Sequence, residues 1–177
     1  EQLISIVPFE SFNIRLLRDK VSIKDVEDLK ENEYNPGGST PLYDAIGFGI
    51  SSIRKEVTDN DSVLVTIITD GEENSSREYS GKAIAASIDE LKQKGWLFTY
   101  IGANQDAVKV AKTMNISNAL NFEQDEEGTK EMFRRERKSR ERFFEKTASF
   151  LGLGKAFAIE ARKEIACEDS YFEDTDK

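Results

Sequence analysis

Apolar residues follow two patterns along the chain, and together these patterns predict alternating strands and helices. Short, nearly continuous apolar runs predict strands at 63–69, 96–101 and 119–122, the first two of them buried on both faces. Apolar residues spaced three and four positions apart predict helices at 40–55, 80–94 and 107–114. Strands that alternate with helices are typical of parallel βαβ units. We therefore expect an α/β protein with a doubly wound, mostly parallel sheet and helices on both faces.

The helix at 107–114 has an apolar stripe that predicts its buried side. We expect this stripe to consist of Ala107, Val108, Ala111 and Met114. In the same way, Ile84, Ile88 and Leu91 are expected to face the core from the helix that starts near Ser80 and stops at Gly95.

The first forty residues carry a different pattern. Residues 3–9 predict a strand, and residues 12–17 alternate apolar and polar positions, so the two segments predict an antiparallel hairpin. The polar stretch 21–34 has apolar residues at the spacing of a short covering helix. A strong loop signal, with proline and two glycines, follows at 35–38.

The C-terminal part of the chain is highly charged. Residues 125–149 predict one long helix, acidic in its first turn and rich in arginine and lysine further on. Glutamates interrupt the basic run, which favours a solvated outer helix over the alternative, a nucleic-acid-binding patch. The acidic residues 168–177 predict a frayed tail. The expected organisation is a main domain at 1–123, a charged helical extension at 124–167 and this tail.

Composition narrows the possible chemistry. The chain has 177 residues and a formal net charge of -9 at pH 7, which argues against nucleic acid or an anionic membrane as its partner. It has no histidine, so it can form neither a histidine-based catalytic triad nor the usual zinc sites. The single cysteine, Cys167, favours a reducing compartment. Since no stretch has the length and apolarity of a membrane span and the chain does not begin like a signal peptide, we expect a cytoplasmic protein without membrane insertion.

Two oxygen-bearing side chains lie where a parallel sheet binds its ligands, outside the carboxyl ends of its strands. Asp70 directly follows the strand at 63–69, and Thr40 precedes Pro41 at the start of a helix. A carboxylate and a hydroxyl are hard oxygen donors, which suit Mg²⁺ or Mn²⁺. Each residue also has a simpler interpretation, because threonine before proline is a common helix N-cap and aspartate after a strand often only forms the turn.

Both residues belong to longer motifs. The sequence YNPGGSTPLYDAI occupies 34–46, and the apolar strand ends in ITDG at 68–71. In this order and spacing, the two motifs resemble the von Willebrand factor A domain family. The opening strand and the elements from residue 96 onward fit the same pattern, so the resemblance covers about residues 3–122.

The resemblance implies a metal-ion-dependent adhesion site, in which three loops hold Mg²⁺ and a carboxylate of a partner protein completes the coordination. Thr40 matches the threonine of the second loop, and Asp70 matches the aspartate of the third. A site with few protein charges leaves the metal electrophilic, which favours an acidic group on the partner. The implied function is a non-enzymatic, protein-binding module. The neighbouring loop residues expected to contact the ligand are Gly38, Ser39, Gly71 and Glu72.

One part of the family pattern is missing. The first metal-binding loop of the family has the sequence DxSxS at the end of its first strand, and this run does not occur in the chain. In the family that strand is central, between the strands that match 3–9 and 63–69, and its absence would leave backbone groups unpaired. We expect a segment before Glu1 to carry it. Alternatively, a partner chain donates the strand, or the two strands pair directly in a reduced sheet, in which case the metal site is inactive.

Two other functions are compatible with the sequence. A metal-independent interaction domain would keep the fold without the metal site. A Mg²⁺-dependent phosphoryl-transfer enzyme would use Asp70, with Glu72 and Glu73 as further carboxylates. This enzyme is the least favoured reading, because the chain has neither a phosphate-binding GxxxxGK loop nor a second aspartate two residues after Asp70.

Overall fold

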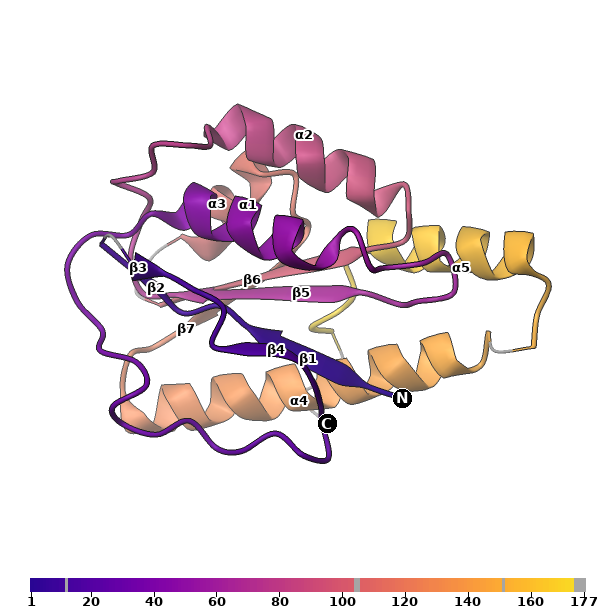
Figure 1. Ribbon diagram of the computed structural model, residues 1–177, viewed down its shortest axis with the longest axis horizontal. Coiled ribbons are helices and arrows are strands. Elements are labelled where there is room, and N and C mark those ends of the chain that lie inside the picture. Colours follow the sequence, from indigo (N-terminus) through magenta and orange to yellow (C-terminus); the bar gives the residue numbers. More distant parts are fainter. Residues whose placement is uncertain (12, 104–105, 151, 174–177) are drawn as a thin grey trace. The chain divides into compact units, whose positions relative to one another are not determined.

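The computed structural model describes residues 1–11, 13–103, 106–150 and 152–173. The chain divides into two compact units, Glu1–Glu56 with Glu72–Ser80 and Val57–Gly71 with Gly81–Lys177. Figure 1 labels the helices and strands of both units. The two units differ in architecture, since the first contains antiparallel ladders and the second a parallel sheet.

The first unit opens with an antiparallel hairpin. Its strands are β1 (Leu3–Ile6), β2 (Phe9–Glu10), β3 (Asn13–Ile14) and β4 (Arg18–Ser22). β2 pairs with β3 next to the turn, and β1 pairs with β4 further away, with an irregularity between Ile4 and Ile6. The predicted hairpin is therefore confirmed, although its second arm continues to Ser22.

The predicted helix at 21–34 is wrong. Val21 lies in β4 directly opposite Ile4, and residues 23–41 form turns and irregular structure. The apolar spacing of this stretch suits a helix, but a β-branched residue packs well in a strand that has a partner across from it. The pairing of β4 with β1 across the hairpin decided the structure here.

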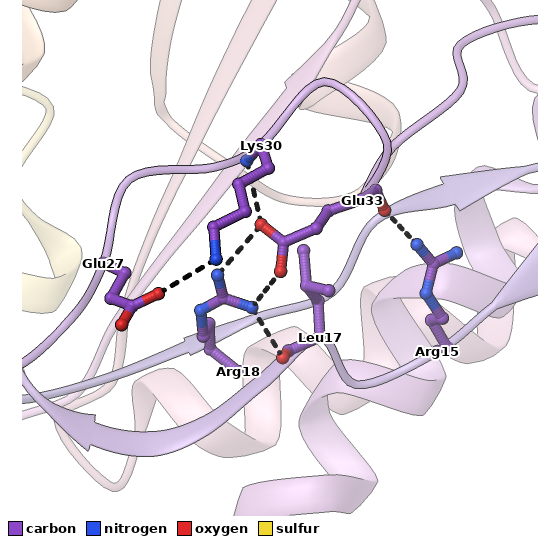
Figure 2. A network of polar contacts seen from close by, with 6 residues as sticks. All are labelled: Arg15, Leu17, Arg18, Glu27, Lys30 and Glu33. Carbon is purple, nitrogen blue, oxygen red and sulfur yellow. Dashed lines mark hydrogen bonds and ion pairs between the residues drawn. The ribbon is translucent and has the colours of Figure 1, made fainter.

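An ion pair anchors the irregular segment to the hairpin (Figure 2). The guanidinium of Arg18 donates to both carboxylate oxygens of Glu33, at 2.8 and 3.0 Å, and the Lys30 N–H donates to the same carboxylate at 2.9 Å. Arg15 donates to the main-chain carbonyl of Glu33. The hydrogen bond from Arg18 lowers the pKa of Glu33 to about 2, so the ion pair persists at pH values where a free glutamate would be protonated.

Helix α1 (Leu42–Ile53) follows this segment and has the predicted apolar stripe. Leu42, Ala45, Ile46 and Ile50 are all buried. On the same helix, Gly47 lies against the ring of Tyr79, and a Cβ atom at this position would be 2.6 Å from the ring atom Cε2. A glycine is therefore needed where the 72–80 segment crosses α1.

The second unit contains a parallel sheet with the strand order β5-β6-β7. Its strands are β5 (Leu64–Thr69), β6 (Leu97–Ala103) and β7 (Asn118–Phe122), connected by α2 (Gly81–Lys92) and α3 (Ala107–Thr113). Both crossovers run in the same direction, so right-handed connections place α2 and α3 on one face. Figure 1 shows α4 (Glu126–Ala148) on the other face. The predicted α/β class, with helices on both faces of a parallel sheet, is confirmed.

The core of this unit forms around β6, all of whose residues are buried. One cluster joins Leu97 and Ile101 of β6 to side chains from β7, α4, α5 (Lys155–Cys167) and the segment after α5, namely Leu120, Met132, Phe143, Ile165, Tyr171 and Phe172. Residues that alternate with these in β6, such as Tyr100, point to the opposite face. As predicted, Ile84, Ile88 and Leu91 of α2 are buried.

Two predicted core positions are exposed. Val108 is 41% exposed, because the buried stripe of α3 repeats at 107, 111 and 114, and Val108 lies about 100° around the helix from Ala107. Ile68 in β5 is 40% exposed, so the prediction that this strand is buried on both faces is wrong at that position.

The C-terminal end confirms one prediction and corrects another. The long charged helix is present as α4, with Asp125 as its N-cap. The prediction of a frayed tail is wrong for residues 168–173, because Tyr171 and Phe172 are 8% and 7% exposed and belong to the core. Burying two aromatic side chains outweighs the cost of ordering an acidic segment. Residues 174–177 lie outside the described residues.

Candidate functional site

The predicted site residues belong to different units. Gly38, Ser39, Thr40 and Glu72 are in the first unit, whereas Asp70 and Gly71 are in the second. The pairing of Thr40 with Asp70 therefore stays a prediction.

Asp70 lies at the carboxyl end of β5, as predicted, and is exposed. The turn after it is held by Thr69, whose hydroxyl donates to the Gly71 carbonyl at 3.0 Å and accepts the Gly71 N–H at 3.2 Å. Gln124, just after β7, donates to the Asp70 carboxylate at 2.9 Å. The fold thus fixes the backbone around Asp70 and gives its carboxylate one neutral hydrogen-bond donor.

The loop before α1 approaches the tip of the hairpin closely at Gly38. Gly38 has φ +80°, and a Cβ atom there would be 1.8 Å from the Ser11 hydroxyl oxygen. The same hydroxyl accepts the N–H of Ser39 at 3.0 Å, and the N–H of Ser11 donates to the Ser39 carbonyl at 2.7 Å. Only glycine permits both this backbone conformation and this contact.

Thr40 is not the N-cap that the sequence suggests. Pro41 occupies the N-cap position of α1 and makes no side-chain capping bond. The 72–80 segment accepts hydrogen bonds from the first turn instead. The main-chain N–H of Tyr43 donates to the Glu73 carboxylate at 3.0 Å, and the main-chain N–H of Asp44 donates to the Ser76 hydroxyl at 3.1 Å.

The backbone of Thr40 is held, but its hydroxyl is not. Its N–H donates to Oδ1 of Asn74 at 2.8 Å, and its carbonyl accepts the Asn74 N–H at 3.2 Å. Among the described residues, none forms a hydrogen bond with the Thr40 hydroxyl.

Glu73 is the central acceptor of the 72–80 segment. Besides the Tyr43 N–H, its carboxylate accepts the Ser75 N–H at 2.8 Å and both the N–H and the hydroxyl of Ser76, at 2.7 and 2.6 Å. Burial raises the pKa of Glu73, but these hydrogen bonds outweigh it, and the pKa lies below its usual value. Glu73 thus stays charged and orders the segment, instead of offering a free carboxylate.

Asp44 in α1 holds the next stretch of the same segment. Its carboxylate accepts the N–H groups of Arg77, Tyr79 and Glu78, at 2.7, 2.8 and 2.9 Å. Burial raises the pKa of Asp44, and the three N–H donors together lower it further than burial raises it. The segment therefore follows α1 closely at several points.

The sequence interpretation missed the residues that organise this loop region. Ser11, Asn74 and Asp44 were not candidates, and Glu73 was considered only as an extra carboxylate. The ENSS sequence at 73–76 carried a usable signal, because Asn and Ser often bond to backbone groups in loops and at helix starts. Their partners, however, lie about thirty residues away and could not be read from local sequence.

Within the described part of the chain, no three His, Cys, Asp or Glu side chains converge in the manner of a carboxylate-rich metal site. The predicted site, with one hydroxyl and one carboxylate, is of a different kind. Among the same residues, no helix combines the length and apolar character needed to cross a bilayer.

Comparisons of the chain with protein-family models, with curated proteins and with solved structures gave no match.

Proposed function

We propose that the chain is a non-enzymatic, protein-binding module of the von Willebrand factor A type, with a doubly wound sheet and a Mg²⁺-dependent adhesion site. Thr40 and Asp70 would hold the ion, and a partner protein would supply an acidic side chain to it. We infer a cytoplasmic location from the single cysteine, Cys167. The loop residues that would surround the ion and the partner group are Gly38, Ser39, Gly71 and Glu72.

The observation that carries this proposal is that the backbone of Thr40 is held while its hydroxyl forms no hydrogen bond within the described part of the chain. Serine and threonine hydroxyls in loops can bond to nearby backbone groups. Here Asn74 makes the hydrogen bonds to the Thr40 backbone. The donors fit the ion, since a hydroxyl and a carboxylate are hard oxygen ligands and the Asp70 carboxylate accepts its hydrogen bond from a neutral group, the Gln124 amide. When bound, Mg²⁺ would supply a positive charge to which a partner carboxylate can bind.

A further observation supports a larger sheet. Within the described sheet of the second unit, β5 has β6 as its hydrogen-bonded neighbour on one side, and its other edge carries no strand. An apolar strand at the edge of a sheet is a place where a further strand can add. This agrees with the central strand that the family pattern requires.

The proposal is tested with Mg²⁺ alone as the probe, by calorimetric titration and thermal unfolding of the full-length protein. Wild-type protein should gain about 2.7 kcal/mol of unfolding free energy at a hundredfold excess of Mg²⁺ over its dissociation constant. Thr40→Val and Asp70→Ala should lose this gain, and Asp169→Ala, which removes an exposed carboxylate elsewhere, should keep it. Wild-type protein without Mg²⁺ binding, or binding that both site variants retain, would refute the metal site.

One observation favours a second candidate, a metal-independent interaction domain. Gln124 already donates a hydrogen bond to the Asp70 carboxylate at 2.9 Å, so this group has a protein partner without a metal. In that case Mg²⁺ would not change the unfolding free energy, and Gln124→Ala would not alter the response to Mg²⁺. Under the metal-site proposal, Gln124→Ala frees Asp70 and should strengthen Mg²⁺ binding.

A further inference from the structure

Ser39 and Thr40 are each held by a pair of reciprocal hydrogen bonds from a distant residue. Ser11 donates its N–H to the Ser39 carbonyl at 2.7 Å and accepts the Ser39 N–H on its hydroxyl at 3.0 Å. Asn74 donates its N–H to the Thr40 carbonyl at 3.2 Å and accepts the Thr40 N–H on Oδ1 at 2.8 Å. All the backbone donors and acceptors of this dipeptide are thereby used.

The two side chains of the dipeptide are left out of this arrangement. In the described residues, neither the Ser39 hydroxyl nor the Thr40 hydroxyl takes part in a hydrogen bond. Serine and threonine hydroxyls in loops can bond to nearby backbone groups, and these two do not do so within the described residues. We call the paired hydrogen bonds from Ser11 and Asn74 the clamps. Clamps that hold the backbone and do not use the hydroxyls suit a loop that must present an oxygen in a fixed position.

Asn74 acts through Thr40 in this arrangement. Its Oδ1 is already occupied by the Thr40 N–H, at a distance typical of a good hydrogen bond. The Asn74 side chain therefore orients the threonine backbone, and the threonine hydroxyl is the oxygen that is left for a ligand.

We propose that Asn74 and Ser11 are positioning residues that hold the Thr40 hydroxyl ready for a divalent cation. This inference rests on the proposed Mg²⁺ site. Groups that orient a metal ligand typically change metal affinity by roughly 10-fold to 100-fold when they are removed. Asn74 contacts Thr40 itself and Ser11 contacts its neighbour, so the loss of Asn74 should have the larger effect.

The test measures Mg²⁺ affinity by calorimetry in the full-length protein. Asn74→Ala should weaken binding roughly 10-fold to 100-fold, and Ser11→Ala should weaken it less. Thr40→Val should abolish binding, because it removes the ligand oxygen itself. Asn60→Ala is the matched control, since the exposed Asn60 side chain makes no hydrogen bond among the described residues, and it should bind as wild type.

A second measurement tests the hydrogen bond between Asn74 and the Thr40 N–H in the absence of metal. The exchange rate of the Thr40 amide proton, measured by NMR, should rise in Asn74→Ala and return toward wild type in Asn74→Asp, which keeps the acceptor oxygen. Because the aspartate adds a charge, its Mg²⁺ affinity is not part of the test. Thr40→Val should leave the amide protected, since the clamp uses only the backbone of residue 40.

The outcomes separate this inference from the proposed function. Weaker Mg²⁺ binding in Asn74→Ala together with faster Thr40 exchange supports the positioning role. Binding that depends on Thr40 but is unchanged in Asn74→Ala overturns the positioning role and leaves the metal site intact. Wild-type protein that does not bind Mg²⁺ overturns both.

Discussion

Asn118 of β7 accepts a hydrogen bond from the main-chain N–H of Tyr171 at 3.0 Å, and its amide nitrogen donates to the Glu168 carbonyl at 2.9 Å. The guanidinium of Arg142 in α4 also donates hydrogen bonds to the main-chain carbonyls of Tyr171 and Glu173, at 3.0 and 2.6 Å. The C-terminal segment is thus held by its backbone, which lets its aromatic side chains enter the core. Part of the basic run in α4 has a structural role of this kind.

The first prediction concerns Asn118, which is 3% exposed. Asn118→Ala leaves the Tyr171 N–H and the Glu168 carbonyl without their partner. A buried polar group without a partner costs about 1 to 3 kcal/mol, so we expect a loss of roughly 2 to 4 kcal/mol in the unfolding free energy. Urea unfolding measures this loss, with Asn60→Ala as the exposed control. A difference below about 0.5 kcal/mol between the two variants would show that Asn118 does not hold the segment.

The second prediction concerns the Tyr171 hydroxyl, which is buried and has no hydrogen-bond partner among the described residues. Burial raises the pKa of this hydroxyl, and the nearby Glu136 carboxylate raises it further. An unpartnered buried hydroxyl costs free energy, so Tyr171→Phe should be neutral or should stabilise the protein by about 1 kcal/mol. The ring itself fills the core, and Phe172→Ala, which removes the neighbouring ring, should cost about 3 to 5 kcal/mol. A clear destabilisation by Tyr171→Phe would mean that the hydroxyl has a partner.

Apolar spacing predicted the second unit well, because its helices and strands bury stripes that local sequence reveals. The buried Ile84, Ile88 and Leu91 of α2 illustrate this. The same reasoning was wrong for 21–34, since the structure of Val21 depends on Ile4 across the hairpin. Spacing within a segment carries no information about such a partner.

The candidate site also has a part that local sequence predicts and a part that it does not. The position of Asp70 after β5 follows from the strand pattern and the glycine beside it, and it was predicted correctly. The interpretation of Thr40 as a helix N-cap was wrong, because Pro41 takes that position and Glu73, from another loop, accepts an N–H of the first turn. The clamps from Ser11 and Asn74 join residues that are far apart in the sequence, so only the folded chain reveals them.

The third prediction concerns Glu136, a carboxyl group of α4 that is 5% exposed. Burial raises its pKa, and Arg140, at 3.1 Å, lowers it only in part. A carboxyl whose pKa is higher in the folded state contributes most stability when protonated, and that contribution is lost as pH rises from about 4.5 through the folded pKa. Glu136→Gln cannot lose a proton and should escape this loss.

The measurement compares the unfolding free energies of wild type and Glu136→Gln between about pH 4 and pH 8. The advantage of the variant should grow with pH by on the order of 1 kcal/mol, a modest value because the attraction of Arg140 offsets part of the cost of burying the charge. Glu141→Gln, on the solvent side of the same helix, serves as the control and should follow the wild-type pH dependence. Parallel curves for wild type and Glu136→Gln would contradict the raised pKa.

The last prediction concerns Glu73, whose pKa is lowered in the folded chain. A carboxylate of this kind contributes stability that is present above its pKa in the unfolded chain, about 4.5, and that is lost as pH falls through the folded value. Glu73→Gln keeps one oxygen acceptor but removes the charge, so it should cost about 1 to 2 kcal/mol at neutral pH, as the loss of a helix cap does. As pH falls through the lowered folded pKa, the variant should come to differ little from wild type, because the wild-type group is then becoming protonated. Urea unfolding at several pH values tests this, with the neighbouring Glu72→Gln as the control, and a cost that stays constant down to pH 2 would show that the charge of Glu73 is not what orders the segment.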